Sequence, residues 1–170
     1  MINGEAMNIL RTIECFYPSV TGPMNQAFRI SSELEKRGIR SPILTTYLDV
    51  EGSLPSEDRF ESVHVKRFKN QLRVMRYCVS LGMLSHLKDF DIIHSHSYRS
   101  FQSDLGFLAA KNKGKPFVIN THGTLLSYRY ILKNPLYSLP HVAYDLLTLR
   151  SSARRADAVV VSSRQEYKKP

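Results

Sequence analysis

Residues 91–121 read DIIHSHSYRSFQSDLGFLAAKNKGKPFVINT, and this stretch decides the fold. Asp91–His96 and Pro116–Thr121 are short apolar segments, as expected of strands in a sheet that is covered on both faces. Between them we expect a helix at Ser100–Lys113, which Gly114 and a following proline end. A strand, a helix and a second strand in this order predict parallel pairing through a helical crossover.

The same alternation of strands and helices continues on both sides of this unit. Further strands are expected at Met7–Glu14, Pro42–Thr46, Ser62–Phe68 and Ala158–Ser162, and further helices at Met24–Arg37, Leu72–Leu87 and Leu136–Arg155. The segments Asp49–Arg59 and Gly123–Pro135 are expected to be irregular. This pattern predicts an α/β fold, a Rossmann-like doubly wound parallel sheet with helices on both faces.

Composition is consistent with one globular domain. Of the 170 residues 42% are hydrophobic and 23% charged, and residues 1–6 form a polar extension before the first strand. No apolar run approaches the ~20 residues that span a bilayer. Cys15 and Cys78 are the only cysteines, so a disulfide framework is not expected and a reducing cytoplasm fits best.

The chain is strongly basic, with a net charge of +9 and a pI near 9.7. Such a surface favours anionic partners, which include nucleic acid, lipid headgroups and phosphorylated substrates. One segment interleaves basic, aromatic and apolar residues. Its basic residues form a candidate cationic surface that would bind a membrane or another anionic partner: Arg67, Lys69, Arg73 and Arg76. It matches no nucleic-acid-binding signature, so no nucleic acid is expected. The alternative reading is a stand-alone basic binding module for anionic lipid or nucleic acid.

Ligands of doubly wound sheets bind beyond the carboxyl ends of the strands, so the residues that follow each strand are the candidate site. After the first strand, Thr21 and Gly22 precede a helix, where main-chain N–H groups can approach a phosphate. An ordinary turn glycine is the alternative. No G-x-G-x-x-G and no G-x-x-x-x-G-K-[ST] occurs, so dinucleotide-binding and P-loop readings are unsupported.

Histidines follow two of the central strands. His94 and His96 share one face of a strand. His96 and Arg99, with Tyr98 between them, lie nearer the expected cleft, where they would bind a polar or phosphorylated acceptor. A zinc site would need His122 as a third ligand, and no carboxylate or thiolate lies nearby in sequence, so no metal is expected. His94 fits a hydrogen-bonded core position.

His122, followed by Gly123 and Thr124, is the most suggestive local feature, because an imidazole at the mouth of a parallel sheet can donate or accept a proton near neutral pH. A packed or capping histidine is the alternative. Ser163 and Glu166 form an S-x-x-E pattern that begins a helix.

Four segments together resemble the N-terminal domain of family 4 glycosyltransferases. They are the loop Tyr17–Gly22 with its L-x-x-x-G helix end at Leu34–Gly38, DIIHSHS at Asp91–Ser97, NTHG at Asn120–Gly123 and ADAVVVSS at Ala156–Ser163. The resemblance implies that residues 1–170 are the acceptor-side half of a two-domain GT-B enzyme, a hexosyltransferase-like protein. The C-terminal nucleotide-sugar-binding domain is absent from this chain, so the isolated domain is expected to be inactive.

The resemblance also implies the chemistry. It implies a retaining transferase that uses a nucleotide-sugar as co-substrate, with no cofactor and no metal. Gly22 would lie near the donor phosphates, beside Thr21 where the family usually has another glycine, and His122 would support the transition state. The residues implied or expected to contact acceptor or sugar are His96, Tyr98, Arg99, Gly123, Thr124 and Ser163.

The expected partners are a nucleotide-sugar donor, a sugar or lipid-linked acceptor and the C-terminal domain of the same protein. The expected location is the cytoplasm, with peripheral contact to the inner face of a membrane, and the expected role is carbohydrate biosynthesis for cell-surface glycans or glycolipids. A sugar-nucleotide epimerase would need acid/base carboxylates at strand ends, where only Glu14 occurs. A dehydrogenase is disfavoured because the G-x-G-x-x-G pattern of dinucleotide-binding proteins does not occur.

Overall fold

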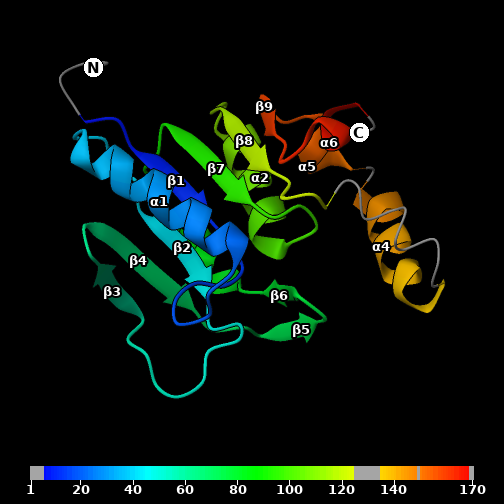
Figure 1. Cartoon of the computed structure of the whole chain (residues 1–170), viewed down its shortest axis with the longest axis horizontal. Coiled ribbons are helices and arrows are strands. Elements are labelled where there is room, and N and C mark those ends of the chain that lie inside the picture. The colour runs from blue at the N-terminus through cyan, green and yellow to red at the C-terminus, as the bar shows by residue number, and fades with distance from the viewer. Residues whose placement is uncertain (1–5, 125–134, 149, 169–170) are drawn as a thin grey trace.

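The computed structural model describes residues 6–124, 135–148 and 150–168, and the described part is built on a seven-stranded sheet (Figure 1). Its strands, in the order β3-β4-β2-β1-β7-β8-β9, pair in parallel except at the antiparallel edge pair β3 and β4. Their bounds are β1 Ile9–Thr12, β2 Ile43–Thr46, β3 Glu57–Phe60, β4 Val63–Phe68, β7 Ile92–His96, β8 Phe117–Asn120 and β9 Ala158–Val160.

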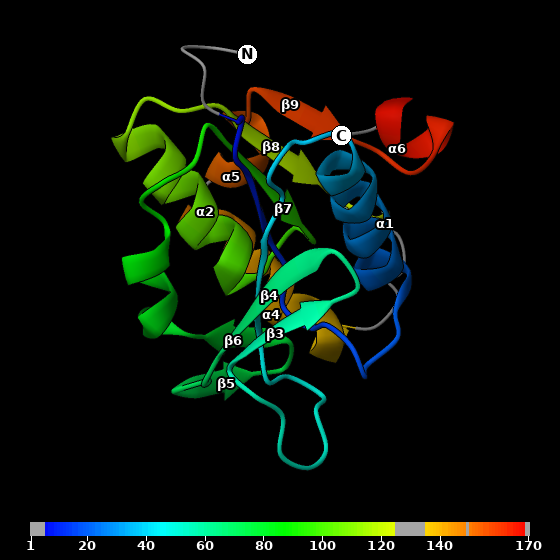
Figure 2. The same ribbon diagram turned by 90° about the vertical axis from the view of Figure 1, so that its left-hand side faces the viewer.

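Helices cover both faces of the sheet, which confirms the predicted fold class. Figure 2 shows α1 (Gly22–Lys36) and α6 (Arg164–Lys168) on one side, and α2 (Phe101–Asn112) and α5 (Ser151–Arg154) on the other. Each side buries its own apolar cluster. Ile13, Ile43, Val63 and Val65 pack with α1 residues, whereas Leu10, Ile93, Phe117 and Ile119 pack with α2 residues. Short strands with apolar residues on both faces are what such a layered arrangement needs.

The chain reverses its direction of progress across the sheet between β1 and β7. From β1 it crosses through α1 to β2 on one side, and from β7 it crosses through α2 to β8 on the other. The parallel register pairs Thr12 with Ser95 and His96 with Asn120, so the carboxyl ends of β1, β7 and β8 lie at one edge. A crevice opens outside the strand ends at such a switch point.

The prediction of a helix at Leu72–Leu87 was wrong. The segment forms a two-stranded hairpin, β5 (Leu72–Val74) and β6 (Tyr77–Val79), followed by the 3-10 helix η1 (Leu81–His86). Met75 turns the chain with a left-handed φ of 55°, and the side chains of Asn70 and Gln71 bind Ser80 and Leu81 across the base of the hairpin. These polar contacts and the strand pairing override the apolar spacing, which is compatible with either structure.

Two other boundaries differ from expectation. The segment predicted as an irregular loop, Asp49–Arg59, ends in the edge strand β3, which is mostly charged and pairs antiparallel with β4. The helix predicted at Leu136–Arg155 is divided into α4 (Pro135–Thr148) and α5, and Arg150, with a left-handed φ of 54°, precedes α5. Most of the predicted irregular stretch after Gly123, and all but Ala6 of the N-terminal extension, lie outside the described residues.

No described helix combines the length and apolar character that crossing a membrane requires.

Gly106 lets α2 lie close against the central strands. A Cβ added there would lie 2.9 Å from Ser95 Oγ and 3.1 Å from Ile93 Cγ2, both fully buried. We expect Gly106→Ala to lower the free energy of unfolding by about 1–3 kcal/mol, because the overpacking exceeds the gain in helix propensity. Urea denaturation measures this. Gly82→Ala, whose nearest contact would be an ordinary 3.5 Å, is the control; an equal effect of both changes would contradict the packing account.

Candidate functional site

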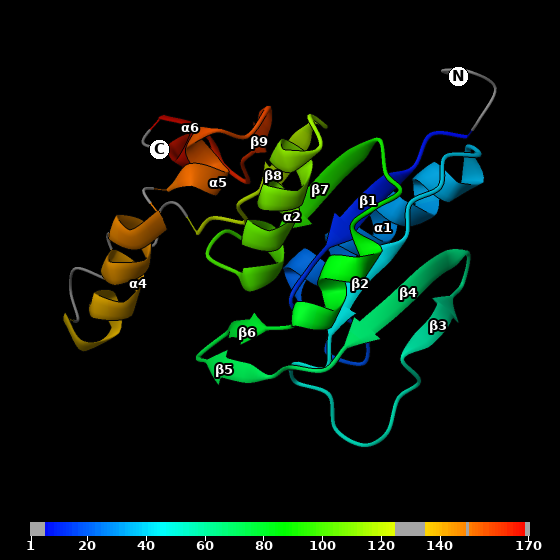
Figure 3. The same ribbon diagram turned by 180° about the vertical axis from the view of Figure 1, so that it is seen from behind.

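A cavity of about 670 Å³ lies at the carboxyl edge of the central strands. The residues that line it come from the ends of β1, β7 and β8, from the β5–β6 hairpin and from α4. Figure 3 shows the hairpin and α4 beyond the arrowheads of these strands. Four residues predicted for the site line this cavity, namely Tyr98, Arg99, His122 and Thr124, together with the hairpin residue Arg76.

His122 lies half-buried on the loop that follows β8. His122 and Gly123 both have left-handed backbones, with φ of 50° and 81°. A non-glycine residue in this region costs free energy, so other contacts must hold it there. Two contacts do so locally. The main-chain N–H of His122 donates to Asn120 Oδ1 at 3.3 Å, and the ring Nε2 of His122 lies 3.1 Å from Nδ1 of His96.

The carboxylate of Glu166 holds the same loop from the neighbouring strand end. Glu166 is fully buried and accepts hydrogen bonds from Thr121 Oγ1 at 2.5 Å, from Gly123 N at 3.2 Å and from Ser162 N at 2.9 Å. Its own N–H donates to Ser163 Oγ at 3.1 Å, which confirms the predicted S-x-x-E helix start. The sequence pattern identified the start of the helix, but it gave no signal that the carboxylate reaches the His122 loop.

Three imidazoles form a stack beneath this loop. The ring centroids of His94 and His96 are 4.7 Å apart, and those of His96 and His122 are 5.3 Å apart. Arg11 closes the inner end, since its Nη1 donates to Nδ1 of His94 at 2.6 Å. His94 therefore carries its proton on Nε2. Among the described residues, no group of three or more His, Cys, Asp or Glu is placed to hold a metal ion.

Burial keeps the stack uncharged. The pKa of His94 is lowered to about 3, mainly by desolvation and secondly by the positive charge of Arg11. Desolvation also lowers the pKa of His96 well below its usual value. Desolvation also lowers the pKa of His122, although the charge of Glu166 acts in the opposite direction. His122 is thus a neutral imidazole at pH 7, able to exchange a hydrogen bond with a ligand but not to supply a positive charge.

His96 does not contact the cavity, although it was predicted to bind the acceptor. Its side chain is fully buried, because it occupies a central strand between the other two rings. Its contact with His122 makes it a support for that ring.

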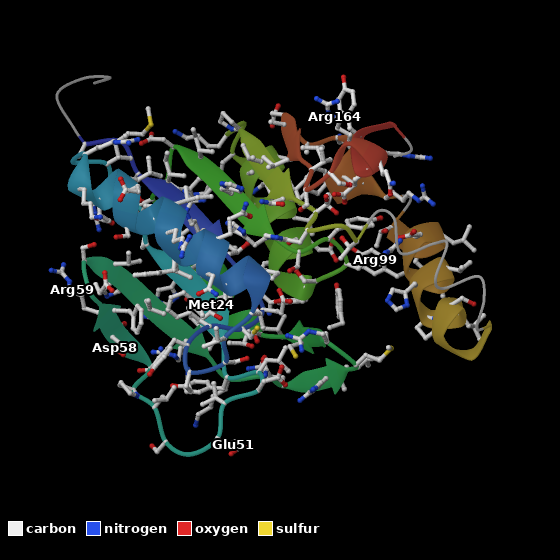
Figure 4. The ribbon with its side chains drawn as sticks, in the orientation of Figure 1. Met24, Glu51, Asp58, Arg59, Arg99 and Arg164 are labelled. Carbon is white, nitrogen blue, oxygen red and sulfur yellow. The ribbon has the colours of Figure 1, made fainter. Side chains whose placement is uncertain are left out.

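Tyr98 and Arg99 line the cavity but direct their polar groups to α4. Tyr98 donates its hydroxyl to Asp145 Oδ1 at 2.9 Å, and Arg99 donates to both carboxylate oxygens at 3.0 and 2.9 Å. The Arg99 and Asp145 side chains are only 7% and 4% exposed, and Arg99 also donates to the carbonyl of Thr124. Figure 4 places Arg99 between the strand ends and α4. Both residues therefore fix the cavity wall in place.

Glu14 is a cavity residue that was not among the predicted ones. It follows β1, is buried, and accepts a hydrogen bond from Ser97 Oγ at 3.2 Å, with Arg76 Nη2 3.8 Å from the same oxygen. Its Oε2 has no hydrogen-bond partner among the described residues. Burial raises the pKa of this carboxyl group. An acid directly after a strand was the available sequence signal.

The predicted phosphate-binding residues begin α1 beside this edge. Thr21 Oγ1 accepts from Met24 N at 3.2 Å and caps the helix, and Pro23 lines the cavity. Gly22 is exposed, and a Cβ built on it would meet no atom within 4 Å outside its chain neighbours and its own helix, so a ligand can approach the main chain there. Ser163 caps α6 and is exposed, outside the residues that line the cavity.

The predicted cationic surface is smaller than expected. The prediction that Arg67 belongs to this surface was wrong, because Arg67 is only 3% exposed and its guanidinium donates to the carbonyl of Tyr17. Lys69, Arg73 and Arg76 are exposed, but Asp49 forms ion pairs with both Arg73 and Arg76, at 3.5 and 2.8 Å. The basic character of this surface is thus partly neutralised.

Comparison with known proteins gives one family. The family model described as Glycosyltransferase Family 4 matches residues 20–169. The match begins in the loop before α1 and includes the His122 loop, Glu166 and α4, whereas Glu14 precedes it. A search of curated proteins found no significant match.

The buried imidazoles predict a pH dependence of stability. An unfolded histidine takes up a proton as the pH falls below ~6.5, whereas folded His94 does so only near pH 3. The unfolded state therefore binds more protons between these values, and stability falls as the pH falls. We expect the difference in unfolding free energy between the wild type and His94→Asn, which retains an acceptor for Arg11, to shrink by about 1.4 kcal/mol per pH unit from pH 6 to 4.

Urea denaturation at several pH values measures this difference. His64→Asn is the matched control for the substitution, since that side chain is 48% exposed. If the unfolding free energy of His94→Asn changed with pH in parallel with that of the wild type, this result would contradict a neutral, buried His94.

Replacing the Glu166 carboxylate tests the anchor of the His122 loop. We expect Glu166→Gln to lower the pKa of His122 further, because the opposing charge of the carboxylate is removed. It should also reduce the free energy of unfolding by about 1–3 kcal/mol. The amide has one acceptor oxygen, whereas the carboxylate uses two oxygens to accept from Thr121, Gly123 and Ser162. NMR titration of the imidazole signals measures the pKa. Glu33→Gln, at an exposed site, should leave it unchanged, and a His122 pKa that rises in Glu166→Gln would refute the contact.

Proposed function

We propose that this chain, which belongs to glycosyltransferase family 4, binds the acceptor and the reacting sugar while a nucleotide-sugar serves as donor, with retention of configuration at the transferred carbon. The observation that carries the proposal is His122, a neutral imidazole fixed at the mouth of the central strands and lining a cavity of about 670 Å³. Ligands of doubly wound sheets bind at this edge.

The N-terminal end of α1 supports a role in holding the donor phosphates. A departing nucleoside diphosphate gains negative charge as the sugar bond breaks, and a fixed helix N-terminus stabilises that charge without rearranging. The exposed main chain at Gly22 allows a phosphate to approach. Thr21, whose hydroxyl already caps the helix, occupies the neighbouring position and narrows the approach.

His122 is suited to binding the sugar rather than attacking it. Its Nε2 is engaged by His96, so Nδ1 is the ring atom that can exchange a hydrogen bond with a sugar hydroxyl. Transfer proceeds through an oxocarbenium-like state, and a fixed neutral hydrogen-bonding group can stabilise that state relative to the ground state. Glu166 and His96 act through His122 as positioning residues, because they hold its loop and its ring.

The proposal includes a nucleotide-sugar-binding domain of the same protein as the other wall of the cleft. Closure of two domains would exclude water and so limit hydrolysis of the donor. In this proposal the nucleotide-sugar is a co-substrate, no cofactor or metal takes part, and the reaction serves carbohydrate biosynthesis in the cytoplasm. A stand-alone basic binding module is less well supported, because Arg67 is buried and the nearby arginines pair with Asp49.

The central test replaces the imidazole. In the protein together with its nucleotide-sugar-binding domain, we expect His122→Ala to lower turnover by well over tenfold, on the order of the 10²-fold effects of removing a fixed hydrogen-bonding group. Affinity for the nucleoside diphosphate should be unchanged. Sugar release and transfer from a panel of UDP- and GDP-hexoses measure turnover, and calorimetry measures affinity.

His64→Ala is the control, because this exposed histidine lies on β4 outside the cavity. Wild-type turnover in His122→Ala would remove the imidazole from its proposed role. Absence of transfer from every donor with the wild type would reject the proposed function itself.

A further inference from the structure

The cavity has an aromatic wall whose hydroxyl groups are already used. Tyr77 and Tyr144 donate their hydroxyls to the two oxygens of Asp104, at 2.9 and 2.5 Å, and Tyr98 donates to Asp145 at 2.9 Å. The rings pack edge to face, with the centroid of Tyr144 5.8 Å from that of Tyr77 and 5.9 Å from that of Tyr98. These tyrosines therefore offer carbon atoms, rather than hydroxyls, to a ligand.

Aliphatic side chains continue this wall out to solvent. Val74 and Met75 at the turn of the hairpin, and Leu147 on α4, all line the cavity. They are also 55%, 49% and 86% exposed. Apolar surface left in water at the open end of a cavity is a favourable binding surface, because covering it stabilises a complex by ~25 cal/mol per Å².

Polar groups line the cavity beside the strand ends, in addition to His141 and Thr148 on α4. Glu14 and Ser97 follow β1 and β7, His122 follows β8, and Arg76 reaches them from the hairpin. The carboxylate of Glu14 can accept a hydrogen bond, the guanidinium of Arg76 can donate one, and neutral His122 can do either. This combination suits hydroxyl groups, which both donate and accept.

We infer that the acceptor bound in this cavity is an amphiphile, with a hydroxylated head at Glu14 and His122 and an alkyl chain between the hairpin and α4. A free saccharide finds few hydrogen-bond partners on this wall and leaves the exposed apolar surface of Val74, Met75 and Leu147 in water. An alkyl chain needs no such partners, and the open apolar end lets it extend beyond the protein. The assignment of this ligand as the acceptor rests on the proposed function.

The probe is dodecyl maltoside below its critical micelle concentration, compared with maltose, which has the same head without the chain. Calorimetry and NMR titration of the protein should show saturable binding of dodecyl maltoside and at least tenfold weaker binding of maltose. Leu147→Ser should weaken dodecyl maltoside binding about fivefold, which corresponds to loss of the contact with one exposed leucine.

Leu146→Ser is the matched control. Leu146 is the preceding residue on α4 and is 69% exposed, but it does not line the cavity, so this change should leave binding unchanged. Equal weakening by both changes would indicate adsorption to a general apolar surface and would overturn the inference. Equal affinity for maltose, or no binding of either probe, would overturn it as well.

These measurements need no donor, so they separate the inference from the proposed function. Binding of the amphiphile through Leu147 without sugar transfer to any hydroxylated amphiphile would reject the transferase proposal and keep the ligand class. Efficient transfer to free saccharides with no gain from an alkyl chain would keep the transferase proposal and reject the amphiphile.

Discussion

The parallel pairing of β7 with both β1 and β8 is the constraint on which the site depends. Because these strands run in the same direction and in register, Glu14, Ser97 and His122 all follow strands that end at one edge. The crossovers through α1 and α2 leave in opposite directions from β1 and β7, so neither helix closes the crevice. Residues separated by more than a hundred positions in sequence thereby line one cavity.

Buried polar contacts then fix the loops at this edge. Glu166 satisfies N–H and hydroxyl groups of two adjacent strand ends, and Asp145 joins Tyr98 and Arg99 to α4. A buried carboxylate is costly unless it is paired or hydrogen-bonded. Each of these carboxylates has such partners, so they hold the His122 loop and the cavity wall in defined positions. The same burial keeps the imidazole stack neutral.

Sequence reasoning predicted the sheet because strand signals depend on local apolar runs that tertiary contacts do not overturn here. It failed at Leu72–Leu87, where Asn70 and Gln71 bind across to Ser80 and Leu81 and stabilise a hairpin that the apolar spacing does not reveal. The site was predicted only where a residue directly follows a strand, as His122 does. Arg67 was predicted to lie on the surface because its hydrogen-bond partner, the main-chain carbonyl of Tyr17, lies 50 residues away in sequence.

The proposed function requires that the neutral His122 and the exposed main chain at Gly22 face one nucleotide-sugar at the carboxyl edge of the sheet. The most direct measurement is an NMR titration of the whole protein with its nucleotide-sugar, which follows the imidazole signals and the Gly22 amide together. The account predicts that the His122 imidazole and the Gly22 amide shift with one binding curve, while the exposed His64 and His86 rings stay unchanged. Shifts of His64 or His86 with neither His122 nor Gly22 affected would contradict it.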